Sequence, residues 1–123
     1  MKGNVLIVDD TEFYRKVYMT KLLSAGYITR VATNGIEALK AMMTQKPDLI
    51  LLDLVMPEMD GFKVLQAVRA SPALNRIPVI VFSSKGAPEE IQKALQAGAN
   101  DFLIKATTTP NKVIEKIEAY LKK

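Results

Sequence analysis

Five polar residues that could together handle a phosphoryl group each lie at or just after the end of a short apolar run. They are Asp9, Asp10, Asp53, Ser83 and Lys105. Three carboxylates in one place repel one another unless protons or a cation intervene, and a hard divalent ion such as Mg²⁺ binds carboxylate oxygens, backbone carbonyls and water. Adding an ammonium and a hydroxyl gives the groups that phosphoryl oxygens prefer. A carboxylate in such a site can act as the nucleophile and form an acyl phosphate.

The apolar runs predict the strands that would carry these residues. The run Leu49-Ile50-Leu51-Leu52 is typical of a strand buried on both faces, as in a parallel sheet. Pro57, after Met56, predicts an extended exit from this strand. The predicted strands cover residues 5–8, 28–32, 49–53, 78–82 and 101–104.

Helical patterns fill the intervals between these strands. The first helix is expected to begin with an N-cap at Asp10 or Thr11 and to stop at Gly26, and the second to be capped by Asn34 and to end before Pro47. The third follows a turn at Asp60-Gly61 and ends near Ser71-Pro72. The fourth starts near Pro88 and stops at Gly98, and the last starts near Thr109-Pro110. The apolar residues of the first helix, Phe13, Val17, Leu22 and Leu23, are spaced for one face. The second helix carries Ala38, Leu39, Met42 and Met43, the third carries Phe62, Val64, Leu65 and Val68, and the last has Val113, Ile114, Ile117, Tyr120 and Leu121 on one side.

Five strands alternating with five helices predict one α/β domain over residues 1–123. The expected architecture is a flavodoxin-like doubly wound parallel sheet in the order 2-1-3-4-5, with helices on both faces and right-handed crossovers. Its switch point lies between the first and third strands, which end in Asp9-Asp10 and in Asp53. Ligands collect at the carboxyl ends of strands in such sheets, so all five polar residues are expected at one edge.

Composition narrows the function classes. The sequence has no cysteine and no histidine, which excludes disulfides, thiolate chemistry and the usual general base. No apolar run reaches the roughly 18–20 residues of a membrane span, and residues 1–4 lack a signal-peptide layout, so we expect a cytoplasmic protein that binds no membrane. The net charge of +4 is scattered without a basic run, which predicts a solvated surface and no nucleic-acid binding.

The ordered set of motifs resembles the receiver domain of two-component response regulators, from about Asn4 to the end of the chain. The matching motifs are Val8-Asp9-Asp10, Leu52-Asp53 with Met56-Pro57 and Asp60-Gly61, Phe82-Ser83-Ser84, and Ala97-Gly98-Ala99 leading to Asp101-Phe102-Leu103-Ile104-Lys105. Ser83 lies 30 residues beyond Asp53, about one strand-helix-strand unit. Each motif alone is weak, and all of them in order are highly specific.

The resemblance implies a role for each residue at the expected site. Asp53 would be the phosphoacceptor, and Mg²⁺ would be bound by Asp10, Asp53 and the backbone carbonyl of Val55, with Asp9 acting through a water. Lys105 would contact the phosphoryl group. Ser83 would move to hydrogen-bond it, and the rotamer of Phe102 would follow Ser83. For Phe102, a plain core position is an equally good interpretation.

The resemblance also implies partners and a mode of action. A histidine kinase or a histidine phosphotransfer protein would supply the phosphoryl group. The phosphorylated chain would then bind a target, or an output domain not present in these residues, through the face formed by the fourth helix, the fifth strand and the last helix. The implied state is a monomer or a dimer formed on phosphorylation. The implied chemistry is limited to Mg²⁺-dependent self-phosphorylation and autodephosphorylation, without enzymatic turnover of a substrate.

One residue departs from the pattern of the resembled family. That family usually has proline after the conserved lysine, with a cis peptide bond, whereas Ala106 follows Lys105 here. A cis Lys-Ala bond would cost about 2.5–4 kcal/mol, against about 0.5–1 kcal/mol for a bond to proline. We expect Lys105 still to reach the site, with the 105–109 loop displaced from the family's usual path.

Two other functions fit the same fold. A flavin- or nucleotide-binding domain would need a Ser/Thr/Gly-rich phosphate loop after the first strand, where this chain has the acidic run Asp9-Asp10-Thr11-Glu12. The other alternative is a receiver-like docking module that works without phosphorylation. The complete acidic set argues against such a module, and Ala106 argues weakly for it.

Overall fold

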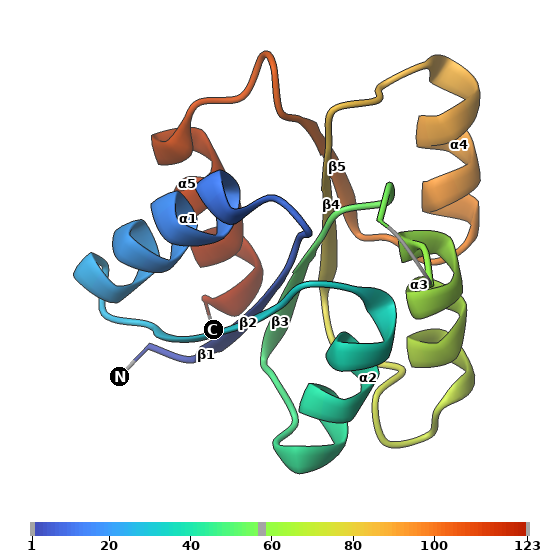
Figure 1. Cartoon of the computed structure of the whole chain (residues 1–123), viewed down its shortest axis with the longest axis horizontal. Coiled ribbons are helices and arrows are strands. Elements are labelled where there is room, and N and C mark those ends of the chain that lie inside the picture. The colour runs from blue at the N-terminus through green and yellow to red at the C-terminus, as the bar shows by residue number, and fades with distance from the viewer. Residues whose placement is uncertain (1, 57–58, 123) are drawn as a thin grey trace.

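A computed structural model describes residues 2–56 and 59–122, and within them five strands alternate with five helices (Figure 1). The predicted exit at Pro57 lies outside the described residues. The elements are β1 (Asn4–Val8), α1 (Glu12–Ser24), β2 (Ile28–Ala32), α2 (Gly35–Thr44), β3 (Leu49–Leu52), α3 (Gly61–Ala70), β4 (Val79–Ser83), α4 (Pro88–Gln96), β5 (Asp101–Ile104) and α5 (Pro110–Leu121).

The strands form one parallel sheet in the order β2-β1-β3-β4-β5, which confirms the predicted flavodoxin-like fold. Helices α1 and α5 cover one face, and α2, α3 and α4 cover the other (Figure 1). The central strands are buried along their whole length because both faces are covered, which explains their unbroken apolar sequences. Within the described residues, no helix is both long and apolar enough to cross a membrane.

Successive residues of each strand point alternately to the two faces of the sheet and pack into two separate cores, one on each face. In β1, Leu6 and Val8 enter the cluster beneath α2, α3 and α4, while Val5 and Ile7 enter the cluster beneath α1 and α5. Burying about two-thirds of the unfolded surface in this way is what a single domain of this size needs.

Several helix ends were predicted correctly from their capping residues. The side chains of Asn34 and Thr109 accept hydrogen bonds from backbone N–H groups in the first turns of α2 and α5. Gly26 and Gly98 follow the ends of α1 and α4 with φ angles of 98° and 112°, the left-handed region that favours glycine. Thr11 stands at the N-cap of α1, but its side chain makes no capping bond.

The predicted face of α1 was partly wrong, and one apolar residue of α2 lies on the exposed side of its helix. Phe13 and Leu23 are 66% and 53% exposed, and the buried residues of α1 are Tyr18 and Leu22. In α2, Met43 is 81% exposed because it lies about 100° around the helix from the buried Met42.

Three smaller predictions also need correction. The fourth strand runs from Val79 to Ser83 rather than over 78–82, and β3 ends at Leu52, so that Asp53 lies just beyond it. Asp60-Gly61 is more than a turn, because Asp60 caps α3 by accepting a hydrogen bond from the Lys63 N–H.

Candidate functional site

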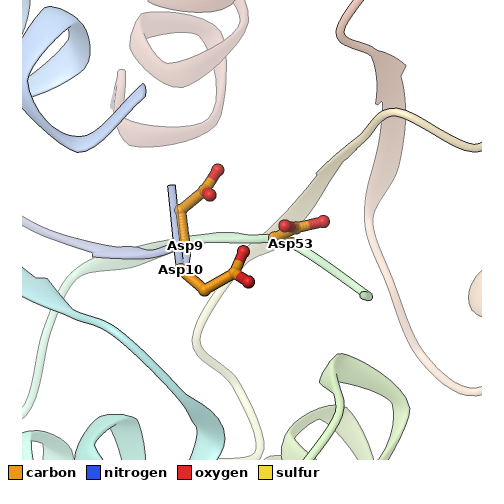
Figure 2. Close-up of side chains that lie close together, drawn as sticks. All are labelled: Asp9, Asp10 and Asp53. Carbon is orange, nitrogen blue, oxygen red and sulfur yellow. The ribbon is translucent and has the colours of Figure 1, made fainter. Parts of the chain in front are cut away.

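The acidic cluster forms where β1 and β3 end side by side. These strands pair in register with Val8 opposite Leu52, and the Asp53 N–H donates to the Val8 carbonyl at 2.9 Å. The residue that follows each of these two strands is therefore an aspartate, and both aspartates lie at the same edge of the sheet. Asp9, Asp10 and Asp53 each offer a carboxylate oxygen, and these oxygens lie within 4.8 Å of one another (Figure 2).

Asp9 is buried, and both of its carboxylate oxygens have partners. Oδ1 accepts a hydrogen bond from the Thr11 N–H at 2.9 Å, and Oδ2 pairs with the Lys105 ammonium at 2.7 Å. The Asp9 backbone carbonyl also accepts from Nη1 of Arg15 at 2.9 Å, which ties the first turn of α1 to the site. Asp10 is exposed, and its side chain points toward Asp53 in Figure 2, so this carboxylate is accessible from solvent.

Asp53 is a buried carboxylate with 4% of its surface exposed. Its Oδ1 accepts from the Val55 N–H at 3.3 Å, and its Oδ2 lies 3.4 Å from the Lys105 Nζ. Burial raises the pKa of Asp53 above its ordinary value; the charge of Lys105 opposes this shift and that of Asp9 adds to it. The site therefore holds negative charge at a cost, and an additional cation would relieve that cost.

Lys105 reaches the site, as the sequence predicted despite the missing proline. Its side chain is 5% exposed, and the ammonium lies between Asp9 and Asp53. The described chain has no cis peptide bond, so the Lys105–Ala106 bond is trans. The Lys105 backbone N–H donates to the Ser83 carbonyl at 2.8 Å and extends the pairing of β5 with β4 by one bond.

Ser83 and Phe102 lie near this edge but make no contact with the carboxylates that the structure records. Ser83 is fully buried, and its hydroxyl oxygen accepts from the Lys85 N–H at 3.3 Å. Phe102 is half-buried and packs against the cluster beneath α2, α3 and α4. Val55 offers backbone groups beside Asp53 while its side chain is 47% exposed.

Sequence reasoning missed two features that shape the site. Gly61 passes so close to the Asp53 carbonyl that an added Cβ would lie 2.3 Å from it. The rings of Tyr14 and Phe82 flank the Lys105 ammonium, with their centroids 4.1 and 5.7 Å from Nζ. The spacing could have indicated Tyr14, since it stands four residues after Asp10, one turn into the helix.

The donor set fits a hard divalent cation. It consists of carboxylate oxygens alone, one carboxylate is exposed, and the cluster carries more negative charge than one lysine balances. The fold and the site thus define a class of protein: a flavodoxin-like α/β domain with an acidic cluster at its topological switch point.

The chain belongs to the response regulator receiver domain family, whose sequence pattern matches residues 5–118. The function of this family is that of a phosphorylation-activated switch in two-component signalling. Among relatives, the chain is 36% identical to the polar-differentiation response regulator DivK of Brucella anthropi, covering 98% of each chain. It superposes on the chemotaxis protein CheY4 of Vibrio cholerae with a TM-score of 0.89 at 30% identity, covering 96% of this chain and 98% of that one.

Other relatives are considerably longer than this chain. The chain is 34% identical to a probable transcriptional regulator, ycf27, of Guillardia theta, over 99% of its own length but only 46% of that protein. It spans about half or less of the length of several such curated relatives.

Proposed function

We propose that Asp53 accepts the phosphoryl group in this receiver domain. The observation that carries the proposal is the buried Asp53 carboxylate, which is clustered with Asp9 and Asp10 and faced by the Lys105 ammonium. An Asp53 oxygen attacks phosphorus as the bond from phosphorus to the donor breaks. The electron pair of that bond leaves with the donor, the imidazole of a phosphohistidine or the carboxylate of acetyl phosphate, and an acyl phosphate remains on Asp53.

Lys105 and Ser83 would hold the transferred group. Lys105 already lies 3.4 Å from Asp53 Oδ2 and would pair with a phosphoryl oxygen. The Ser83 hydroxyl would donate a hydrogen bond to another phosphoryl oxygen, on the side of Asp53 that faces β4. Neither residue needs to act as a proton carrier, because carboxylate attack on a phosphoryl group requires no general base.

Mg²⁺ would be held by Asp10, Asp53 and the Val55 carbonyl, with Asp9 acting through a water. The exposure of Asp10 supports a direct role, and the engagement of both Asp9 oxygens by Thr11 and Lys105 supports an indirect one for Asp9. When bound, Mg²⁺ neutralises charge on the phosphoryl oxygens and offsets the repulsion among the carboxylates.

Signal output would begin at Ser83. To reach the phosphoryl group, its hydroxyl would give up the Lys85 N–H, which lies at the start of the segment leading to α4. Phe102 on the neighbouring strand would follow, and the surface of α4, β5 and α5 would change its affinity for a target or an output domain. The phosphoryl donor would be a histidine kinase or a histidine phosphotransfer protein, and a cytoplasmic location stays a prediction.

Acetyl phosphate with Mg²⁺ tests this function directly. Intact-protein mass spectrometry should show one added phosphoryl group on the wild type, none after chelation of the metal, and none on Asp53→Asn. Asp60→Asn is a matched control, because it removes an aspartate that only caps α3, and it should still be labelled. Equal labelling of Asp53→Asn and the wild type would refute the assignment.

The same experiment separates a switch from a docking module that works without phosphorylation. A docking module would show no labelling and no change in Mg²⁺ affinity with a phosphoryl mimic. The position of Lys105, aimed at Asp53 although Ala106 replaces the usual proline, favours the switch.

A further inference from the structure

The Lys105 ammonium is enclosed by aromatic rings as well as by carboxylates. Its Nζ lies over the Tyr14 ring, 4.1 Å from the centroid, and 5.7 Å from the centroid of Phe82. Both distances fall within the roughly 6 Å range of cation–π attraction, which is strongest where the cation is shielded from water. Only 5% of the Lys105 side chain is exposed, so the contact with Tyr14 belongs to the shielded kind.

The Tyr14 ring is itself fixed by other rings. It meets Phe82 edge to face, with centroids 5.8 Å apart and an interplanar angle of 86°. Phe82 is 2% exposed and in turn meets Tyr18 at 5.0 Å. Edge-to-face pairs of this kind hold ring orientations, so the wall beside Lys105 is anchored in the core beneath α1.

The fixed position of the Tyr14 ring matters because few other contacts would orient the Lys105 side chain once a metal ion is bound. The Lys105–Ala106 bond is trans, and the Ala106 side chain is exposed. In the structure the ammonium is held by Asp9 at 2.7 Å and by Asp53 at 3.4 Å. A divalent cation would draw on the same carboxylates and repel the ammonium, whereas the ring offers attraction without competing for the metal.

We propose that Tyr14 is a positioning residue that keeps Lys105 directed at the phosphoryl group through its ring face, with Phe82 supporting the ring. The role rests on the proposed function of Asp53 and adds to Lys105 and Ser83 a further group outside the acidic cluster on which the reaction would depend. Its chemistry requires an aromatic ring at position 14 and does not require the tyrosine hydroxyl.

The first test compares Tyr14→Leu with Tyr14→Phe. With saturating Mg²⁺ and acetyl phosphate, Tyr14→Leu should be phosphorylated about tenfold more slowly than the wild type, and its affinity for beryllofluoride should fall by a similar factor. Tyr14→Phe should behave like the wild type in both assays. The Mg²⁺ affinity of both variants should stay within about twofold of the wild type, because Tyr14 supplies none of the oxygen atoms proposed to bind the metal.

A double-mutant cycle separates action through Lys105 from a general loosening of α1. In a Lys105→Met background, Tyr14→Leu should cause no further loss of rate. A loss of equal size in both backgrounds would show that Tyr14 acts through stability alone. A Tyr14→Phe variant as slow as Tyr14→Leu would likewise overturn the proposal.

Nuclear magnetic resonance gives a readout that does not depend on phosphorylation. The Lys105 ε-methylene protons should be shifted upfield by the ring current in the wild type and in Tyr14→Phe, and this shift should disappear in Tyr14→Leu. A wild type that takes no phosphate overturns the proposed function and the role of Tyr14 with it. A wild type that is phosphorylated, with an unaffected Tyr14→Leu, overturns the role of Tyr14 alone.

Discussion

Gly61→Ala should destabilise the protein and weaken the metal site together. A Cβ at position 61 would lie 2.3 Å from the Asp53 carbonyl oxygen and 2.6 Å from the Leu54 Cα, both backbone atoms. Ordinary contacts begin near 3.4 Å, so the N-terminus of α3 or the segment after β3 must move by about 1 Å. The φ angle of Gly61 is not among the positive ones, so the strain comes from this contact and not from the backbone conformation.

The magnitude follows from three contributions. Overpacking against atoms that cannot rotate away costs about 1–3 kcal/mol. The Gly61 N–H bond to the Leu54 carbonyl, 3.0 Å long, lies at the same contact, and its distortion costs about 1 kcal/mol. Replacing glycine by alanine in a helix stabilises the helix by about 1 kcal/mol, which offsets part of these two losses. The free energy of unfolding should therefore fall by about 2 kcal/mol, which lowers the melting temperature by about 8 °C in a chain of 123 residues.

Gly86→Ala is the matched control for this prediction. Its Cβ would meet Ile104 Cδ1 at 2.4 Å, which is the free end of a side chain that can change rotamer. Urea denaturation should therefore show a loss below about 1 kcal/mol for Gly86→Ala. Titration of Mg²⁺ should show weaker binding only for Gly61→Ala, because that variant displaces Asp53 and Val55. Equal stability of the two variants, or an unchanged Mg²⁺ affinity in Gly61→Ala, would refute the argument from close backbone packing.

Three further substitutions test the charges of the fold. Because burial raises the pKa of Asp53, the folded protein binds this proton more tightly than the unfolded chain, and the free energy of unfolding falls as pH rises from the ordinary pKa to the raised one. Asp53→Asn should remove this loss and melt higher than the wild type at neutral pH, as calorimetry across that interval would show. Lys105→Met should lower the free energy of unfolding by about 3 kcal/mol, because it leaves two buried carboxylates unpaired. It should also raise the Mg²⁺ affinity, because it removes a cation that competes with the metal for the same carboxylates. An unchanged Mg²⁺ affinity would contradict this competition between Lys105 and the metal. Arg69→Met should lower the free energy of unfolding by about 2–3 kcal/mol, because the Arg69 guanidinium donates to three backbone carbonyls, including that of Gly98. Arg76 is exposed, so Arg76→Met should leave the free energy of unfolding unchanged in the same urea denaturation experiment.

The sheet and the placement of the acidic cluster could be predicted because each depends on local sequence and one topological rule. The apolar runs defined the strands to within a residue, and the alternation of elements defined their order. Once β1 and β3 are neighbours in register, Asp9 and Asp53 must share an edge. The position of Lys105 follows from the same reasoning, since it comes directly after β5 on that edge whatever residue comes next.

The buried face of α1 includes two tyrosines, which are missing from the four apolar residues that predicted this face. Tyr14, Tyr18 and Leu22 are spaced by four, which places them on one side of a helix, and all three pack on the core. Phe13 and Leu23 are more apolar than tyrosine, yet they lie off this stripe and are exposed. The sequence therefore did not predict the ring beside Lys105, because Tyr14 is not among the residues predicted for this face.

Gly61 shows a different limit. The pair Asp60-Gly61 favours a turn by local chemistry, and nothing local indicates that α3 packs its first residue against the backbone after β3. A glycine required by contact with a distant segment has the same sequence signal as a glycine required by its own φ angle. Only the fold distinguishes the two, and here the contact is with the backbone carbonyl of Asp53, the proposed phosphoacceptor.

The proposed role of the Tyr14 ring would bear on switching as well as on rate, because of the charges around Lys105. Without metal, the ammonium neutralises part of the acidic cluster and pairs most closely with Asp9. Binding of a divalent cation would add positive charge to that cluster, so the attraction that holds Lys105 would fall as the site became ready to react. A phosphoryl group on Asp53 would then restore negative charge and draw the ammonium back. Between these two states the contact with the Tyr14 ring would not depend on the charge of the carboxylates, so it would keep the ammonium near the place where the phosphoryl oxygens would arrive.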